Sequence, residues 1–78
     1  MVTINTDKSS QTKQVAFDKE KNIMYVTFRS NGSTYVYSPV TAKQFDKLIE
    51  APSIGSHLHK NFNKKTPGLD IRIKNKYG

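Results

Sequence analysis

Basic side chains are concentrated in the last third of the chain, where they could contact phosphate groups. Residues 57–78 hold six basic side chains and one acidic one, a net charge of +5, whereas residues 1–56 hold seven basic and five acidic ones, a net charge of +2. The basic residues of the last third are Lys60, Lys64, Lys65, Arg72, Lys74 and Lys76. Such clustering favours a polyanionic partner, nucleic acid above all, although a solvated charged face that keeps a small protein soluble has the same composition.

Two further groups of residues could add to such a site. Tyr25 and Arg29 fall on one side of an expected strand, where a ring could stack on a base and a guanidinium could pair with a phosphate, although an ordinary polar sheet face looks the same. Ser53, Gly55 and Ser56 open an expected helix, whose free N–H groups and positive dipole end favour an anion. The alternative is that Ser53 is only an N-cap and Gly55 allows the helix to pack closely on the sheet.

The sequence contains no recognisable catalytic, metal or cofactor site. His57 and His59 are two positions apart, so on a helix they point about 200° apart and cannot bind one metal together. The chain has no cysteine, which excludes a thiolate zinc site and a disulfide framework and fits a reducing compartment. No segment has the spacing of a nucleotide-binding loop or the length of a membrane span. We therefore expect a cytoplasmic protein with no enzymatic activity, no cofactor, no metal and no membrane association.

The length of the chain limits what it can build. At 78 residues it has room for one small domain over 1–78, which buries only about 60% of the surface that the unfolded chain exposes. Such a thin core has few residues to spare for supporting a catalytic cleft. The basic residues of 66–78 then form either a last strand of this domain or a disordered tail.

An Asn-Gly pair at Asn31 and Gly32 predicts a hairpin with a two-residue type I′ turn, because both central positions of that turn need positive φ. This turn pairs Phe28 with Tyr35. Because side chains alternate along a strand, one face is expected to carry Met24, Val26, Phe28, Tyr35 and Tyr37. The other face is expected to carry Tyr25, Thr27, Arg29, Thr34 and Val36. The two tyrosines at 35 and 37 are therefore expected in the core rather than as exposed stacking rings.

Further strands surround this hairpin. A strand over 14–17 and a loop over 18–22 lead into a strand over 23–29, which gives a three-stranded antiparallel meander. A flexible lead-in over 6–12 comes first, and a short strand over 2–5 could precede it. Residues 69–74 alternate between apolar and charged side chains, which predicts a last strand that leaves Arg72 and Lys74 outward. This strand could pair with an edge of the meander or with the segment at 2–4.

Two short helices are expected between the meander and the last strand. Thr41 and Gln44 form a capping box that starts the first helix, and Pro52 ends it. Ser53 starts the second helix. The apolar positions are Phe45, Leu48 and Ile49 on the first helix and Ile54, Leu58 and Phe62 on the second. The expected fold is α+β: a three-stranded antiparallel meander, two short helices packed on one face and an additional C-terminal edge strand. Its core is expected to contain Val26, Phe28, Tyr35, Tyr37, Phe45, Leu48 and Phe62.

Several short motifs follow one another in a recognisable order: Val15-Ala16-Phe17-Asp18, an alternating strand, a glycine turn, Tyr35-Val36-Tyr37, Val40-Thr41, a short helix and Ala51-Pro52-Ser53-Ile54-Gly55. This order resembles the KTSC domain family, named for the lysyl-tRNA synthetase C-terminus, over residues 10–65. The resemblance implies a small α+β module of bacterial and phage proteins, for which RNA binding is the suggested function. His57-Leu58 stands where the family has a pair of aromatic residues, and the tail from Thr66 lies outside the resemblance.

Two functions remain open at this point. The first is a module that binds RNA or single-stranded nucleic acid through the basic last third of the chain, with Tyr25 or Arg29 stacking on bases. The second is a bacterial or phage regulatory module that binds a protein partner through the polar sheet face, the helix pair or a strand edge. The sequence does not decide between these partners, and it leaves the oligomeric state open.

Overall fold

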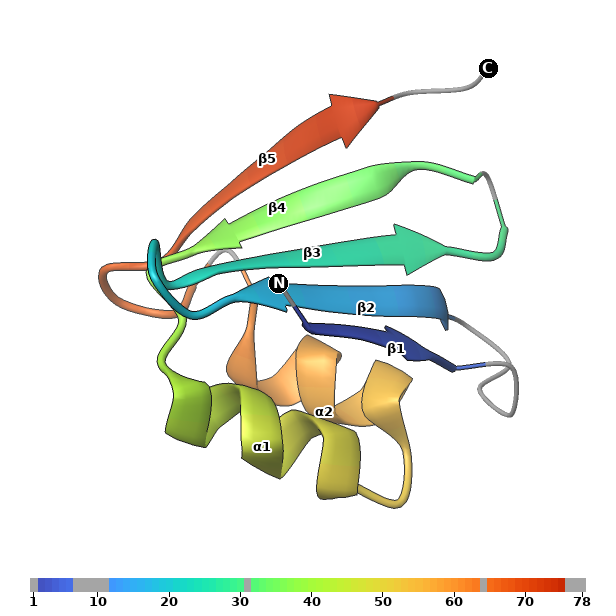
Figure 1. Cartoon of the computed structure of the whole chain (residues 1–78), viewed down its shortest axis with the longest axis horizontal. Coiled ribbons are helices and arrows are strands. Elements are labelled where there is room, and N and C mark those ends of the chain that lie inside the picture. Colours follow the sequence, from blue (N-terminus) through green and yellow to red (C-terminus); the bar gives the residue numbers. More distant parts are fainter. Residues whose placement is uncertain (1, 7–11, 31, 64, 76–78) are drawn as a thin grey trace.

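A single antiparallel sheet carries two helices on one of its faces (Figure 1). The computed structural model describes residues 2–6, 12–30, 32–63 and 65–75, with the side chains of 73–75 excepted. Along this part of the chain the elements are β1 (Val2–Asn5), β2 (Thr12–Asp18), β3 (Ile23–Phe28), β4 (Thr34–Ser38), α1 (Ala42–Glu50), α2 (Ile54–Asn61) and β5 (Asp70–Asn75). The α+β class is therefore as expected from the sequence.

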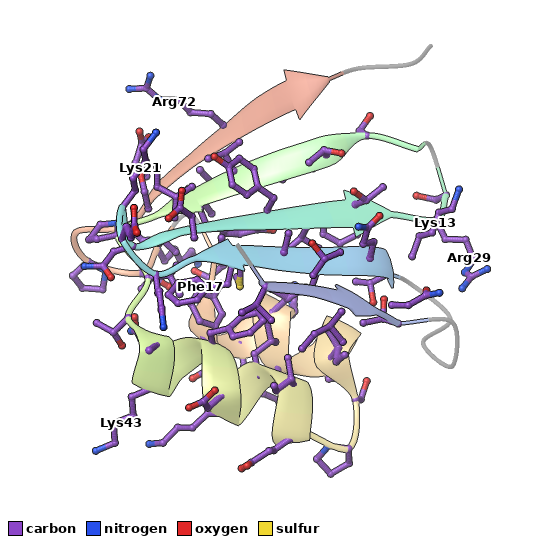
Figure 2. The ribbon with its side chains drawn as sticks, viewed as in Figure 1. Lys13, Phe17, Lys21, Arg29, Lys43 and Arg72 are labelled. Atoms are coloured by element: carbon purple, nitrogen blue, oxygen red, sulfur yellow. The ribbon has the colours of Figure 1, made fainter. Side chains whose placement is uncertain are left out.

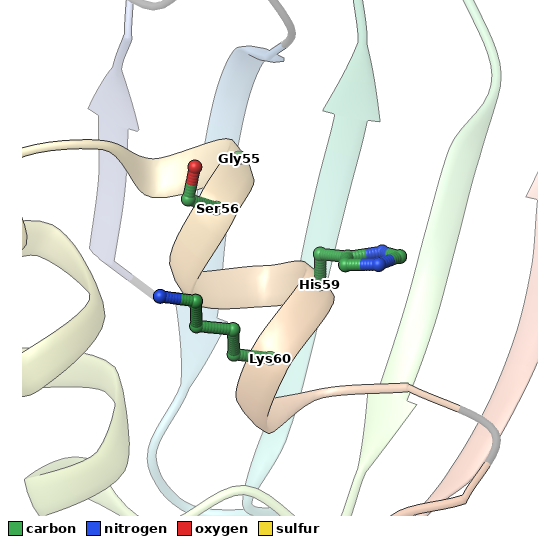
Figure 3. Close-up of a pocket in the computed structure, with 4 residues that line it drawn as sticks. All are labelled: Gly55, Ser56, His59 and Lys60. Carbon is green, nitrogen blue, oxygen red and sulfur yellow. The ribbon is translucent and has the colours of Figure 1, made fainter.

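The order of the strands in the sheet is the same as their order in the chain. Neighbouring strands pair antiparallel from β1 to β5, and both helices lie in the connection between β4 and β5. Figures 1 and 3 show the helices nearest to β1, β2 and β3, with β5 farthest from them. The three-stranded meander expected from the sequence corresponds to β2, β3 and β4. The prediction of three strands is too small. β1 and β5 extend the meander to five strands within the described residues, and β5 pairs with β4 rather than with β1.

The hairpin between β3 and β4 has a longer loop than the Asn-Gly pair predicts. Val26 pairs with Tyr35, which differs by two residues from the predicted register. The Phe28 carbonyl accepts a hydrogen bond from the Gly32 N–H and the Phe28 N–H donates one to the Ser33 carbonyl, each at 3.0 Å. The turn therefore spans residues 29–32 and ends on Gly32, whose φ of 67° lies in the left-handed region. Asn31 itself is outside the described residues.

This error in register leaves the two predicted faces intact. A slip of one residue would exchange the faces of a strand, but a slip of two returns every side chain to its own side. Met24, Val26 and Tyr37 are buried under the helices, whereas Tyr25 and Thr27 lie on the helix-free face. The face that contacts the helices is called the inner face and the other the open face.

The core lies between the inner face and the helices. Phe17 of β2 stacks on Phe45 of α1, with ring centroids 4.9 Å apart, and Tyr37 meets Phe62 edge to face at 6.2 Å. The buried apolar residues are Val15, Phe17, Met24, Val26, Tyr37, Val40, Phe45, Leu48, Leu58 and Phe62. Phe28 and Tyr35, which were also expected in the core, are only half-buried at its margin.

Helix α1 begins and ends where the sequence predicts. The Thr41 hydroxyl accepts from the Gln44 N–H at 3.2 Å and the Gln44 side chain accepts from the Thr41 N–H at 2.9 Å, so the capping box is present. Ala51 is extended, with ψ 143°, because Pro52 follows it. Neither helix in the described part of the chain is long and apolar enough to cross a membrane.

The N-terminal lead-in is shorter than expected. β2 begins at Thr12 rather than at residue 14, and the Thr6 N–H donates to the Lys13 carbonyl at 3.1 Å. One end of the predicted lead-in is therefore part of β2, and the other is hydrogen-bonded to it. An irregularity between Thr12 and Gln14 breaks the alternation of side chains at that point, which conceals the start of the strand in the sequence. Residues 7–11 lie outside the described residues.

Candidate functional site

Two shallow hollows adjoin α2 on the inner side of the sheet. The inner hollow, of about 210 Å³, lies between α2 and strands β3 and β4 and is lined by Phe28, Tyr37, Gly55, Leu58, His59, Phe62 and Asn63. The outer hollow, of about 360 Å³, is lined by Gly55, Ser56, His59 and Lys60 (Figure 3). Gly55 and His59 belong to both linings, so the two hollows are adjacent.

The spacing of residues on α2 places these side chains together. Gly55, Leu58, His59 and Phe62 recur at intervals of three and four, so they share one side of the helix. Leu58 and Phe62 are buried in the core, whereas His59 is exposed at the mouth of the hollows. In Figure 3 His59 extends from α2 toward β4, whereas Ser56 and Lys60 lie on the opposite flank of the helix, toward β1 and α1.

Aromatic rings line the inner hollow. Tyr37 and Phe62 meet at an interplanar angle of 80°, and Phe28 meets Tyr35 at 89° with ring centroids 5.2 Å apart. His57 also contacts Phe62, at 6.0 Å, so this histidine packs against the core instead of facing His59. Because Phe28 is only half-buried, part of its ring is accessible to a planar ligand.

The rim of the inner hollow is held in place by Asn63. Its side-chain amide donates to the His59 carbonyl at 2.8 Å and to the Lys60 carbonyl at 3.3 Å, and its oxygen accepts from the Lys65 N–H at 2.8 Å. These bonds satisfy carbonyl groups that the end of α2 would otherwise leave open. Asn63 therefore fixes both the end of the helix and the path of the chain that carries Lys65.

The electrostatic environment of the hollows is neutral to positive. No described residue that lines either hollow is acidic, and the whole segment 51–69 contains no aspartate or glutamate. Burial, with a smaller effect from Tyr35, raises the pKa of the Tyr37 hydroxyl from 10.0 to about 12. The Tyr37 hydroxyl is therefore protonated at neutral pH and can donate a hydrogen bond.

The residues proposed from the sequence as an anion site bond to one another. The Ser53 hydroxyl accepts from the Ser56 N–H at 3.4 Å and donates to the Ser56 hydroxyl at 3.2 Å. Gly55 is buried against the sheet side of the helix. These contacts make Ser53 the N-cap of α2, as in the alternative considered from the sequence. Ser56 still lines the outer hollow beside Lys60.

The open face carries a different group of predicted residues. The strand registers place Tyr25, Val36 and Arg72 next to one another on adjacent strands. The Arg72 Nε lies 2.7 Å from the Asp70 Oδ2, with both side chains exposed, and the Thr27 and Thr34 hydroxyls bond at 2.9 Å. The positive charge of Arg72 is thus offset locally by a carboxylate.

The structure therefore divides the predicted nucleic-acid residues between separate surfaces. Lys60 lies on α2 and Lys65 follows it, whereas Tyr25 and Arg72 lie across the sheet from them. Arg29 is at the far end of the sheet from Arg72 (Figure 2). Lys64 and Lys76 are outside the described residues, as is the side chain of Lys74.

Six residues of the hollows were not among those singled out as binding residues: Phe28, Tyr37, Leu58, His59, Phe62 and Asn63. Phe28 and Tyr37 were assigned to the core. His59 was considered only as half of a histidine pair. The spacing of Gly55, Leu58, His59 and Phe62 was available as a signal that one side of α2 mixes apolar and polar groups.

Comparisons with known proteins identify the family. The family model of the KTSC domain matches residues 8–65. An uncharacterised protein of Stutzerimonas stutzeri is 34% identical over 55 residues, which are 70% of this chain and 76% of that protein. The crystal structure of a KTSC domain protein from Yersinia pestis superimposes with a TM-score of 0.79 at 22% identity, over 99% of this chain and 97% of that one. This protein belongs to the KTSC domain family.

Proposed function

We propose that this KTSC domain is a non-enzymatic module that binds single-stranded nucleic acid, RNA in particular, through the two hollows beside α2. The observation that carries the proposal is the position of an aromatic-lined hollow next to a segment that has lysines and histidines but no acidic residue. Single-strand binding proteins combine these same two features, a stacking platform and a positive path for the backbone.

The inner hollow supplies the stacking platform. Phe28 offers a half-buried ring beside the buried Tyr37 and Phe62, and His59 stands at the mouth. A base that entered would cover apolar ring surface that is now in contact with water, and the protonated Tyr37 hydroxyl could donate a hydrogen bond to an acceptor on the base edge.

The outer hollow supplies the contact to the backbone. Lys60 lines it, and Lys65 follows shortly after the end of α2. With no carboxylate between residues 51 and 69 to compete for these ammonium groups, they remain available for phosphate. The proposal thus keeps Lys60 and Lys65 from the basic segment and assigns no contact to Tyr25 or Arg72, which lie on the other face.

Fluorescence anisotropy tests the proposal with labelled RNA and DNA single strands of about ten nucleotides, a length typical of one small binding domain. The affinity should fall with salt, with a log-log slope of roughly −0.7 for each phosphate contact. Lys60→Ala should weaken binding several-fold and reduce the slope by about 0.7.

Lys43→Ala is the matched control, since Lys43 is an exposed lysine on the neighbouring helix α1. It should leave both affinity and slope near the wild-type values. Absence of binding at low salt, or equal effects of the two variants, would overturn the proposal. The alternative function, docking of a protein partner, would appear as capture of one protein that nuclease treatment does not release.

A further inference from the structure

Strand β5 forms one edge of the sheet and has an unusual sequence pattern. Its neighbour among the described residues is β4 alone, so its other edge presents backbone N–H and C=O groups that no described strand pairs with. The sequence around its start reads Leu69-Asp70-Ile71-Arg72-Ile73, which alternates apolar, acidic, apolar, basic and apolar residues.

This pattern is complementary to itself when two copies run antiparallel. With Ile71 opposite Ile71 of a second copy, Asp70 falls opposite Arg72, and Arg72 opposite Asp70. Leu69 and Ile73 are opposed in the same way. Opposite charges directly across a strand pair are stabilising and like charges are destabilising. In this register each Asp70 faces an arginine and each Arg72 faces an aspartate, so no like charges are opposed.

The described side chains of β5 are partly or fully accessible on both faces of the sheet. On the open face the Asp70 carboxylate and the Arg72 guanidinium are 54% and 77% exposed. Arg72 uses its Nε for Asp70, which leaves the remaining guanidinium donors for a second carboxylate. On the inner face Leu69 and Ile71 pack against the core but remain half-buried. The helices cover this face near β1, β2 and β3 and lie farthest from β5.

We propose that this chain forms a symmetric dimer in which the β5 strands of two copies pair antiparallel about Ile71. The two sheets then join into one continuous sheet, and each Ile71 covers the apolar flank of the other. The two copies are related by a two-fold axis perpendicular to the sheet. The helices of both copies therefore lie on the same face of the continuous sheet. The proposal does not depend on nucleic-acid binding, since it uses a different edge of the molecule.

The alternative is that the charges at this edge serve to prevent pairing, as charged residues on sheet edges often do. Analytical ultracentrifugation distinguishes the two over a concentration range from micromolar to about millimolar, because a strand edge is a small interface and such contacts are weak. The proposal expects a reversible monomer–dimer equilibrium in this range. A monomer at every concentration would overturn it.

Charge variants test the register. Arg72→Asp places a carboxylate opposite a carboxylate at two symmetric positions, so dimerisation should weaken at least tenfold. The double variant Asp70→Arg with Arg72→Asp exchanges the two charges and restores both the internal pair and the cross-strand pairs. It should dimerise like the wild type. Equal dimerisation by the wild type and Arg72→Asp would contradict the proposed register.

A cysteine variant tests the contact itself, and the chain contains no cysteine that could interfere. Directly opposed residues have Cα atoms about 4.5–5.5 Å apart, within the range of a disulfide. Ile71→Cys should therefore form a disulfide-linked dimer under mild oxidation. The matched control is Ile4→Cys, a half-buried isoleucine on the opposite edge strand β1, which should cross-link at least tenfold more slowly. Equal rates for the two variants would exclude the β5 pairing.

Discussion

The two faces of the sheet differ in how their polar and aromatic residues are used. On the open face Arg72 is paired with Asp70 and Thr27 with Thr34, so charges and hydroxyls are satisfied by near neighbours. On the inner face the aromatic residues pack against each other and the helices, until Phe28 at the margin is left half-covered beside α2. The exposed Arg72 is thus paired with a carboxylate, whereas the ring of Phe28 remains partly uncovered.

The difference follows from the position of the helices. α1 and α2 pack against the inner face through Phe45, Leu48, Leu58 and Phe62, nearest to β1, β2 and β3. The inner hollow lies between α2 and strands β3 and β4. The same residues that build the core thus also build the wall of the candidate site.

The largest expected effect tests the contrast in burial. Met24 and Ile23 are adjacent on β3, but Met24 is fully buried on the inner face and Ile23 is half-buried on the open face. Met24→Ala should lower the free energy of unfolding by about 2–5 kcal/mol, because it leaves a cavity in the core. Ile23→Ala should cost less than about 1 kcal/mol, since water can fill the space. Urea denaturation measures both, and equal costs would contradict the assignment of the two faces.

A second prediction concerns pH and the buried Tyr37. Its pKa is raised to about 12, so between pH 10 and 12 the unfolded chain loses this proton while the folded protein keeps it. The unfolded state is thereby favoured as the pH rises, and stability should fall by about 2–3 kcal/mol by pH 12 from this group. The variant Tyr37→Phe should lack this part of the loss of stability at high pH.

The measurement for Tyr37 is the difference in unfolding free energy between the wild type and Tyr37→Phe at pH 9 and near pH 12. Other groups titrate equally in both proteins and cancel in the difference. A difference that does not change with pH would show that water reaches the Tyr37 hydroxyl and would contradict its burial.

The smallest expected effect compares one aromatic ring on each face. Phe28→Leu removes a ring that lines the inner hollow, and Tyr25→Leu removes a ring from the open face. Because stacking on a base contributes about 1–3 kcal/mol, Phe28→Leu should weaken RNA binding by roughly 5- to 150-fold. Tyr25→Leu should change the affinity less than about two-fold. The reverse order would move the binding surface to the open face, where the sequence predicts that Tyr25 could stack on a base.

Local sequence signals predict the local parts of this fold well. The capping box at Thr41, the helix end before Pro52 and the two faces of the β3–β4 hairpin all depend on residues within a few positions of one another. The register of that hairpin is not predicted, because a two-residue slip preserves the alternation on which the prediction relies.

The candidate site is harder to predict because it depends on tertiary packing. The inner hollow exists because α2 lies where the packing of Phe62 on Tyr37 places it, and no local pattern specifies how far a helix extends over a sheet. The sequence shows that basic residues cluster in the last third of the chain. It does not show that the sheet separates Lys60 on α2 from Arg72 on β5. Charge counted along the chain therefore overestimates charge gathered on one surface.

The strand order of the sheet also has a consequence for folding kinetics. β1 to β4 pair through short connections, whereas the pairing of β4 with β5 encloses residues 39–69 and both helices. Closing a longer loop costs more chain entropy, and contacts distant in sequence form late. β5 is therefore expected to join the sheet last during folding and to detach first in native-state fluctuations, so its amide protons should exchange soonest among those of the paired strands. Covering its free edge would slow that exchange.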